Sequence, residues 1–383
     1  MPGGGAFATI MSEIIPVHCE EDCRDAGARA ASVLNQGGLV AFPTETVYGV
    51  GARADHREAL HRLRTLKARP DGQPFTVHIA DPSRVRDYVP NLTDLGRRLV
   101  RKGWPGPLTL LFRVPDPVCT PALEDRDAAL ATEIYHAGEI GLRCPDHDVA
   151  RGMLAGVTGP VIAASANRVG RAPACDASAA MVELGDGIDL LLDAGPAKFG
   201  MPSTVVRVGE NEYEVVREGV WNARTLRRLA SMDFLFICTG NTCRSPMAAG
   251  LFRHRLAARL GCAVSELADH RVCVGSAGTS AADGSKVSPE AVTVMRRRGV
   301  DISDHRARRV NPELIDQADC IYVMTRSHAG AVAAAVPSAE AKTKLLSDDG
   351  DIEDPIGGGV SVYESCAANI EKALTKRLGE VRL

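Results

Sequence analysis

The chain has 383 residues, more than the roughly 250–300 over which one hydrophobic core usually grows, so two domains are expected. Hydrophobic residues make up 45% of the sequence and charged residues 24%, which excludes a disordered or fibrous protein. A net charge of −3 gives no general reason to expect a nucleic-acid or membrane surface.

The N-terminal segment MPGGGAFATIM is expected to be a leader without regular structure, and Met11 is an alternative start. It has no basic region and no long apolar run, so we predict neither a signal peptide nor a membrane anchor. The 11 cysteines lack the dense, even spacing of a secreted disulfide scaffold, and no pair of CxxC motifs indicates a metal site. A reducing, cytoplasmic location fits this pattern best.

Short apolar runs alternate with helical stretches from residue 12 to residue 228. The runs predicted as strands are 37–42, 75–80, 108–112, 161–165 and 203–208. The stretch 221–232 predicts a closing helix, after which the apolar run 234–237 begins a second unit. The sequence therefore predicts two α/β domains, residues 12–228 and 232–383, without internal repeats.

Polar residues of the first domain fall at the ends of its predicted strands and helices. The loop Pro43–Gly51 (PTETVYGVG) is rich in hydroxyl groups and glycine. The other residues of this kind are Lys67, Arg69, His78, Arg143, Ser165, Asn167 and Ser203. Polar groups at strand ends around one sheet commonly converge on a pocket, which predicts a site for a small polar ligand. Taken singly, each residue also fits a structural role, such as a plain turn or a buried core histidine.

The motifs PTETVYGVG, KARP, WPGPLTL, GLRCP, SAN and PSTVV resemble the threonylcarbamoyl-AMP synthase family over roughly residues 12–228. The resemblance implies a twisted mixed α/β sheet with a concave, positively lined cavity. It also implies synthesis of threonylcarbamoyl-adenylate from threonine, bicarbonate and ATP, with release of pyrophosphate. The product would feed threonylcarbamoyladenosine formation in tRNA, which makes the tRNA threonylcarbamoyl transferase machinery an implied partner.

The same resemblance implies which residues meet each substrate. For threonine they are Thr46, His78, Arg143 and Ser203, and for ATP they are Lys67, Arg69, Ser165, Asn167 and Arg217. Cations there would neutralise the triphosphate as charge shifts to pyrophosphate. Magnesium is expected with ATP, although no dedicated carboxylate cage is visible. Glu139 departs from the family pattern, which usually has a small or hydroxyl residue at this place near the nucleotide. A carboxylate there is expected to repel phosphate. An RNA- or nucleotide-binding module that uses the same basic cavity remains an alternative.

In the second domain the predicted elements alternate regularly. They are strand 234–237, helix 246–260, strand 272–278, helix 288–299, strand 320–324 and helix 362–378. This order predicts a doubly wound parallel sheet, in which ligands bind at the carboxyl ends of the strands. The first strand–helix turn, Cys238–Pro246 (CTGNTCRSP), is therefore the place to expect chemistry.

The spacing of Cys238 and Arg244 predicts a phosphate site. Five intervening residues let the loop's N–H groups point inward as an anion nest beside a helix N-terminus. These amides and Arg244 are expected to lower the pKa of the Cys238 thiol, while the arginine fork holds phosphate oxygens. We expect Ser245 to cap the helix, Pro246 to be its first residue, and Gly240 to supply a positive φ. A buried cysteine beside a surface arginine is the structural alternative.

Attack by a thiolate also needs an acid to protonate the leaving group, and Asp354 in DIEDPIGG is the candidate. Pro355 stiffens its loop, and the glycines that follow let the backbone approach the site. Four more acidic residues share this stretch, Asp348, Asp349, Asp351 and Glu353. Their crowding is expected to favour the protonated form that an acid requires.

The motif CTGNTCRSPMA with a downstream DP resembles the low-molecular-weight protein tyrosine phosphatase family, from Met232 to the end of the chain. The resemblance implies Cys238 as nucleophile, Arg244 as phosphate binder and Asp354 as general acid, without a cofactor. The remaining phosphate-loop residues are Thr239, Gly240, Asn241, Thr242, Cys243 and Ser245, of which Asn241 and Ser245 are expected to order the loop.

The substrate is expected to be a phosphorylated protein. Ile356–Gly358 stands where tyrosine-specific members often have paired tyrosines, and Thr242 replaces a bulky aliphatic residue, as in bacterial protein-arginine phosphatases. Phosphoarginine and phosphotyrosine both remain open, with phosphoarginine preferred. Cys243 either forms a reversible disulfide with Cys238 or packs inward. Arsenate reduction would need a relay of cysteines, and the sequence has no close C-terminal pair. The whole chain is thus expected to be a bifunctional enzyme.

Overall fold

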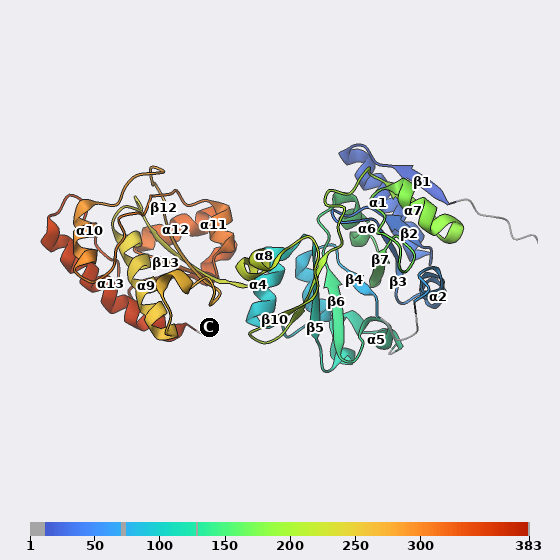
Figure 1. Cartoon of the computed structure of the whole chain (residues 1–383), viewed down its shortest axis with the longest axis horizontal. Coiled ribbons are helices and arrows are strands. Elements are labelled where there is room, and N and C mark those ends of the chain that lie inside the picture. The colour runs from blue at the N-terminus through green and yellow to red at the C-terminus, as the bar shows by residue number, and fades with distance from the viewer. Residues whose placement is uncertain (1–11, 70–73, 128, 382–383) are drawn as a thin grey trace, which may run out of the picture. The chain divides into compact units, whose positions relative to one another are not determined.

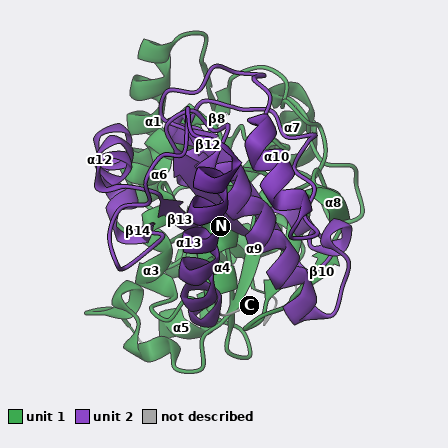
Figure 2. Cartoon of the chain, turned by 90° about the vertical axis from the view of Figure 1, so that its left-hand side faces the viewer, with its two compact units in different colours: residues 1–226 green, residues 227–383 purple. Residues whose placement is uncertain are grey.

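A computed structural model of the chain describes residues 12–69, 74–127 and 129–381. The N-terminal leader therefore lies outside the described residues. The chain divides into two compact units, Met1–Leu226 and Arg227–Leu383 (Figure 2). The division falls within helix α8 (Ala223–Ala230), at the place where the sequence predicts a closing helix.

Unit 1 is built on one mixed ten-stranded sheet (Figure 1). Its strands are β1 (Glu13–Pro16), β2 (Val40–Phe42), β3 (Gly49–Arg53), β4 (Thr76–His78), β5 (Leu108–Arg113), β6 (Glu139–Arg143), β7 (Val161–Ser165), β8 (Leu190–Asp193), β9 (Thr204–Val208) and β10 (Tyr213–Arg217). Their order across the sheet is β1-β8-β2-β3-β7-β4-β6-β5-β9-β10, with parallel and antiparallel pairs. The predicted mixed α/β fold is confirmed.

The helices of unit 1 connect these strands. They are α1 (Glu20–Asn35), α2 (Arg57–Leu66), α3 (Val85–Tyr88), α4 (Asp94–Gly103), α5 (Ala129–Ile134), α6 (Asp148–Ala155) and α7 (Ala177–Leu184). Helices α1 and α6 cover one face, where Leu34 and Met153 pack with Phe42 and Leu192 of the sheet. The motif Pro43–Gly51 is only partly a loop, because its last three residues begin β3, which pairs with β2 and β7.

Unit 2 is a four-stranded, fully parallel sheet with strand order β12-β11-β13-β14. The strands are β11 (Met232–Cys238), β12 (Val272–Gly278), β13 (Cys320–Val323) and β14 (Thr343–Leu345). The helices are α9 (Arg244–Leu260), α10 (Pro289–Arg296), α11 (Pro312–Gln317), α12 (Arg326–Ala335) and α13 (Val360–Glu380). The predicted doubly wound parallel sheet is confirmed, whereas α11, α12 and β14 were not predicted.

Strand β11 carries two apolar faces, as a central strand of a parallel sheet requires. Phe234 and Phe236 pack with Phe252 of α9, and Leu235 and Ile237 pack on the opposite side with the core of α11 and α12. Helix α9 ends at Leu260, and its C-cap is Gly261, whose φ of 68° is the left-handed conformation that glycine adopts easily. Burial on both sides fixes the end of β11, and hence Cys238, at the edge where the helices begin.

Within the described part of the chain, no helix is both long enough and apolar enough to cross a membrane.

Candidate active sites

A cavity of about 410 Å³ opens in unit 1 among the ends of its strands. Eight of the nine residues predicted to meet threonine or ATP line it: Lys67, Arg69, His78, Arg143, Ser165, Asn167, Ser203 and Arg217. They come from segments far apart in the sequence, and the sheet brings them together. The predicted convergence of polar groups on one pocket is therefore present.

The side chain of Arg143 is bound by the PTET loop, residues 43–46. Its Nη2 donates to Glu45 Oε1 at 2.9 Å and to Thr46 Oγ1 at 2.7 Å. Glu45 is 3% exposed and its other oxygen accepts from the backbone N–H of Asp146 at 3.1 Å. Within the described part of the chain, the buried Nε of Arg143 has no hydrogen-bond partner. Since buried donors are almost always satisfied, this atom marks a place for a ligand acceptor.

Among the described residues, the other cations of the cavity, Lys67, Arg69 and Arg217, form no ion pair with a carboxylate. Lys67 Nζ donates to the carbonyl oxygens of Ser165 and Asn167, and burial followed by the charge of Arg69 lowers the pKa of Lys67 to about 8. Burial also lowers the pKa of Arg69 and of Arg217, with the charges of Arg64 and Arg143 as smaller causes. Bringing cations together in this way is unfavourable without an anion, so the cavity is suited to a phosphate chain.

Two further polar atoms of this cavity, Arg69 Nε and Asn167 Oδ1, lack a partner among the residues that the structure describes. One is a donor and the other an acceptor, so they can meet different parts of a ligand. Ser203 Oγ lies 2.9 Å from Thr109 Oγ1 and accepts from Arg217 Nη2 at 3.1 Å. The serine is thus oriented by groups on two neighbouring segments.

His78 is neutral in this cavity. Burial is the main cause that lowers its pKa to about 3, and the nearby charge of Arg143 lowers it further. Its Nδ1 donates to the carbonyl oxygen of Thr76 at 3.2 Å, so Nε2 carries the lone pair. His78 can therefore accept a hydrogen bond from a ligand but is a poor base.

The structure places Thr46 and Glu139 differently from the expectations. Thr46 is fully buried, and its hydroxyl supports Arg143, whereas the neighbouring Thr44 lines the cavity. Glu139 was expected near the nucleotide, but it pairs with Arg207 at 2.8 Å and lines a separate groove. The predicted repulsion of phosphate by Glu139 is therefore wrong.

Sequence reasoning missed Glu45, Tyr48 and Thr109, although the first two lie in the motif it singled out. The described residues that line the cavity include no Asp or Glu, the ligands magnesium prefers. Among the described residues no group of three His, Cys, Asp or Glu side chains could hold a metal ion. The lining does not fit a protein-bound magnesium, and we derive no step through it.

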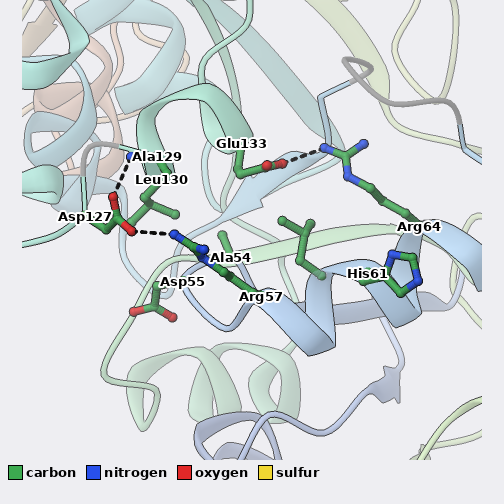
Figure 3. Close-up of a pocket in the computed structure, with 10 residues that line it drawn as sticks. Ala54, Asp55, Arg57, His61, Arg64, Asp127, Ala129, Leu130 and Glu133 are labelled. Atoms are coloured by element: carbon green, nitrogen blue, oxygen red, sulfur yellow. Dashed lines mark hydrogen bonds and ion pairs between the residues drawn. The ribbon is translucent and has the colours of Figure 1, made fainter.

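A second pocket of unit 1, of about 460 Å³, lies between α2 and α5 (Figure 3). Two ion pairs cross it, Arg57 with Asp127 at 2.9 Å and Arg64 with Glu133 at 2.7 Å. Arg64 also lies over the ring of Phe75, on which Arg69 stacks at 4.5 Å. Arg57 and Arg64 are thus each paired with a carboxylate that lines the same pocket.

In unit 2 the turn between β11 and α9 curls around the sulfur of Cys238. Cys238 Sγ lies 3.0 Å from Ser245 Oγ and accepts from the backbone N–H of Asn241 at 3.3 Å. Asn241 Nδ2 in turn donates to Ser245 Oγ at 2.8 Å and to Ser276 Oγ at 2.9 Å. Asn241 and Ser245 therefore order the loop, as expected.

Three local details of this loop differ from the predictions. Helix α9 begins at Arg244 with Cys243 as its N-cap, so Ser245 does not cap it and Pro246 is its third residue. The positive φ, 54°, belongs to Asn241 and not to Gly240. Asn241 can hold this conformation because the imidazole of His305 and the backbone N–H of Arg308 bind its oxygen atoms.

The pKa of the Cys238 thiol also shifts against the expectation. Burial raises it, while hydrogen bonds from Ser245 and Asn241 and the charge of Arg244 act in the opposite direction. Burial is the largest cause, since the side chain is 2% exposed. The loop amide and Arg244 act in the predicted direction, but burial outweighs them, so the predicted net lowering of the pKa is wrong.

Arg244 and Asp354 meet at the mouth of the loop. Arg244 Nη2 forms an ion pair with Asp354 Oδ2, and Nη1 donates to the carbonyl oxygen of Ile352 at 3.0 Å. The buried Nε of Arg244 has no hydrogen-bond partner among the described residues. Asp354 is 37% exposed, so its carboxyl group can reach a ligand.

The expected crowding of carboxylates around Asp354 is wrong. Asp348 and Asp349 form ion pairs with Lys376 and Lys372 of α13. Asp351 accepts from the backbone N–H of Arg326, the first residue of α12. These groups stabilise the loop that carries Asp354 rather than gathering at the site.

Cys243 packs inward. Its sulfur is within hydrogen-bond distance of Ser288 Oγ, at 2.9 Å, and of Tyr363 OH, at 3.2 Å. It is 4% exposed, and all eleven cysteines are free thiols. Of the two alternatives for Cys243, the structure favours inward packing.

Two family models match the chain. One, described as telomere recombination and covering the Sua5, YciO and YrdC proteins, matches residues 32–219. The other, low molecular weight phosphotyrosine protein phosphatase, matches residues 233–382. A putative threonylcarbamoyl-AMP synthase of Mycobacterium tuberculosis is 33% identical over 219 residues, which are 55% of this chain and 95% of that protein. A protein-arginine-phosphatase of Geobacillus stearothermophilus is 38% identical over 151 residues, which are 38% of this chain and 93% of that protein. The chain belongs to both enzyme families.

Two further comparisons concern the synthase-family unit, residues 1–226. The threonylcarbamoyl-AMP synthase of Bacillus subtilis is 33% identical over 192 residues, 50% of this chain and 53% of that protein, so the chain spans about half its length. A solved variant of Sua5 from P. abyssi has a TM-score of 0.50 at 21% identity, covers 79% of this chain and 100% of its own, and is alike in fold.

The matched ranges contain both sites. The cavity residues of the synthase-family unit run from Thr44 to Arg217, inside the first range. Cys238, Arg244 and Asp354 of the phosphatase-family unit, residues 227–383, lie inside the second.

Proposed function

We propose that the phosphatase-family unit is a cysteine-dependent phosphatase. The observation that carries this proposal is the convergence of the Cys238 sulfur, the unpartnered Nε of Arg244 and the carboxyl group of Asp354 on one loop. A phosphate oxygen takes the place of the Asp354 carboxylate at the Arg244 guanidinium. This frees Asp354 to face the leaving group.

In the proposed reaction, the Cys238 thiolate attacks phosphorus, and the bond from phosphorus to the leaving atom breaks as Asp354 donates a proton to that atom. Water then attacks the cysteinyl phosphate, gives a proton to Asp354, and releases phosphate and the thiolate. The hydrogen bonds from Asn241 and Ser245 and the charge of Arg244 stabilise the thiolate against the cost of its burial.

We propose phosphoarginine in a protein as the substrate, in keeping with the relative named above. Thr242 is half-buried in the loop, and its hydroxyl has only a long contact of 3.6 Å to Cys243 Sγ, so it can accept from a guanidinium N–H. Ile356 is 67% exposed and offers no aromatic surface for a phenyl ring. Both features disfavour phosphotyrosine.

Replacing Thr242 with isoleucine is expected to lower kcat/KM for phosphoarginine peptides about 10–100-fold relative to phosphotyrosine peptides. The substitution removes the acceptor and leaves a buried guanidinium N–H unpaired, at a cost of about 1–3 kcal/mol. Thr242→Ser keeps the hydroxyl group and is the matched control. An unchanged ratio in the isoleucine variant would refute the specificity argument.

We propose that the synthase-family unit makes threonylcarbamoyl-adenylate from threonine, bicarbonate and ATP, and releases pyrophosphate. Its support is the cluster of Lys67, Arg69, Arg143 and Arg217 around a cavity whose described lining residues include no carboxylate. Lys67 and Arg69 meet the phosphates, while Arg143, His78 and Ser203 surround threonine. This chemistry depends on positioning and charge stabilisation and needs no covalent intermediate.

Pyrophosphate release by the purified chain tests this reaction. It is expected to require ATP, threonine and bicarbonate together. Release that does not depend on threonine would favour the alternative, a nucleotide-binding module.

The pKa of Lys67 gives a pH prediction. A lysine whose pKa is lowered to about 8 is charged below that pH and neutral above it. ATP affinity is therefore expected to fall about tenfold as pH rises from about 7.5 to about 9.5, because one cation near the phosphates is lost. Bound ATP raises this pKa, which extends the fall toward higher pH.

Titration calorimetry across this range measures the effect. The matched control is Lys67→Arg, whose guanidinium stays charged throughout and is expected to remove the pH dependence. A wild-type affinity that stays constant from about pH 7.5 to 9.5 would show that Lys67 does not bind the nucleotide.

A further inference from the structure

Helix α12 (Figure 1) carries His328, a buried histidine that has no role in the mechanism above. It is 4% exposed. Its Nε2 lies 3.0 Å from Thr239 Oγ1, and its Nδ1 lies 2.8 Å from Thr325 Oγ1. Thr239 is the residue directly after Cys238, so the imidazole touches the loop at its start.

The hydrogen bonds around His328 can be assigned a single direction. Arg244 has only donors, and its Nη2 donates to Thr239 Oγ1 at 3.4 Å. The proton of the Thr239 hydroxyl can then go to His328 Nε2. The proton of His328 therefore sits on Nδ1, which donates to Thr325 Oγ1.

Thr325 extends this series of hydrogen bonds to Ser327. Its hydroxyl oxygen also accepts from the backbone N–H of His328, as the N-cap of α12, so its proton goes to Ser327 Oγ at 2.8 Å. The hydroxyl of Thr239, the Nδ1 proton of His328 and the hydroxyl of Thr325 then each have an acceptor. This arrangement requires a neutral imidazole.

The charges that face His328 favour the neutral form. Burial lowers the pKa of His328, and the Arg244 charge lowers it further, whereas Asp354 and Asp351 act in the opposite direction. A second proton, on Nε2 in addition to the one on Nδ1, would make the imidazole a cation beside Arg244. Thr239 Oγ1 would then face two donors, His328 Nε2 and Arg244 Nη2.

We propose that His328 is a positioning residue of the phosphatase site, which acts through Thr239 to hold the Nη2 edge of the Arg244 guanidinium. The inference rests on the proposed phosphatase function. Asp354 binds the same Nη2 and has to leave it to protonate the leaving group. Thr239, anchored by His328, keeps that edge of the guanidinium in place while Asp354 moves.

The test compares His328→Met, which removes the acceptor at similar volume, with His328→Gln, whose amide oxygen can still accept from Thr239. His328→Met is expected to lower kcat about tenfold and to weaken vanadate inhibition by a similar factor, with a smaller change in KM. His328→Gln is expected to recover most of both losses. Thermal unfolding of each variant shows whether it is folded.

A double-mutant cycle separates positioning from simple packing. If His328 acts through Thr239, His328→Met adds little to the loss already caused by Thr239→Val. Independent, additive losses would overturn the inference. So would a His328→Met variant with the wild-type kcat and vanadate affinity.

The outcome for the wild type distinguishes the two proposals. A wild-type chain that hydrolyses neither phosphoarginine nor an aryl phosphate refutes the phosphatase function and, with it, this role of His328. An active wild type with unchanged His328 variants refutes only the latter. Independently of turnover, ¹⁵N shifts of the His328 ring are expected to show a protonated Nδ1 and an unprotonated Nε2.

Discussion

Replacing Cys238 with serine is expected to reduce phosphatase turnover about 10⁴-fold or more. The serine hydroxyl can keep the contacts to Asn241 and Ser245, so the loop is expected to fold. What is lost is the nucleophile, because an alcohol is far harder to ionise than a thiol. Hydrolysis of a phosphoarginine peptide by purified wild type and variant measures the effect.

The matched control is Cys320→Ser, which changes a half-buried cysteine of β13 away from the loop. It is expected to retain turnover within about twofold. Threonine-dependent release of pyrophosphate is expected to be the same in all three proteins, because Cys238 lies outside the cavity of the synthase-family unit. More than a tenth of wild-type turnover in Cys238→Ser would mean that another group attacks phosphorus.

The parts of the phosphatase site that the sequence predicted are those set by local order. A buried strand, five residues and a helix place Cys238 and Arg244 on one loop without help from the rest of the chain. Asp354 was predicted because it directly precedes a proline in the acidic loop DIEDPIGG. The strand–helix alternation likewise gave the parallel sheet of unit 2.

Residues that depend on tertiary contacts could not be predicted. His328 lies 89 residues from Thr239, and no local pattern joins them. The positive φ falls on Asn241 because His305 and Arg308, distant in sequence, hold its oxygen atoms. The direction of the Cys238 pKa shift depends on how deeply the fold buries the loop, which spacing does not reveal.

In the synthase-family unit, the sequence motifs predicted where the cavity lies but not which of their side chains line it. Thr46 was expected to meet the ligand, yet it lies behind Arg143 beside Glu45. Glu139 was expected at the nucleotide. In the structure it lies opposite Arg113 in the register of β5 and β6, and its side chain forms an ion pair with Arg207. Side-chain direction along a strand follows from register, which the sequence alone did not determine.

Replacing Arg143 with lysine is expected to raise the KM for threonine about 10–100-fold, with a smaller change in the KM for ATP. The arginine fork binds Glu45 and Thr46 with Nη2 and keeps Nε for a ligand. Lysine retains the charge that the buried Glu45 needs, which avoids the roughly 3–5 kcal/mol cost of an unpaired buried carboxylate. Its single ammonium cannot reach the loop and the ligand at once.

Arg53→Lys is the matched control, since Arg53 also forms a two-point contact with a carboxylate, Asp55, but lies outside the cavity. It is expected to leave both KM values within about twofold of wild type. Initial rates of pyrophosphate release, with threonine and ATP varied separately, measure them. Equal increases for the two substrates in Arg143→Lys would indicate a distorted cavity. A selective increase for threonine requires that Arg143 contacts this substrate, because a lysine that merely loosened the PTET loop would affect ATP as well.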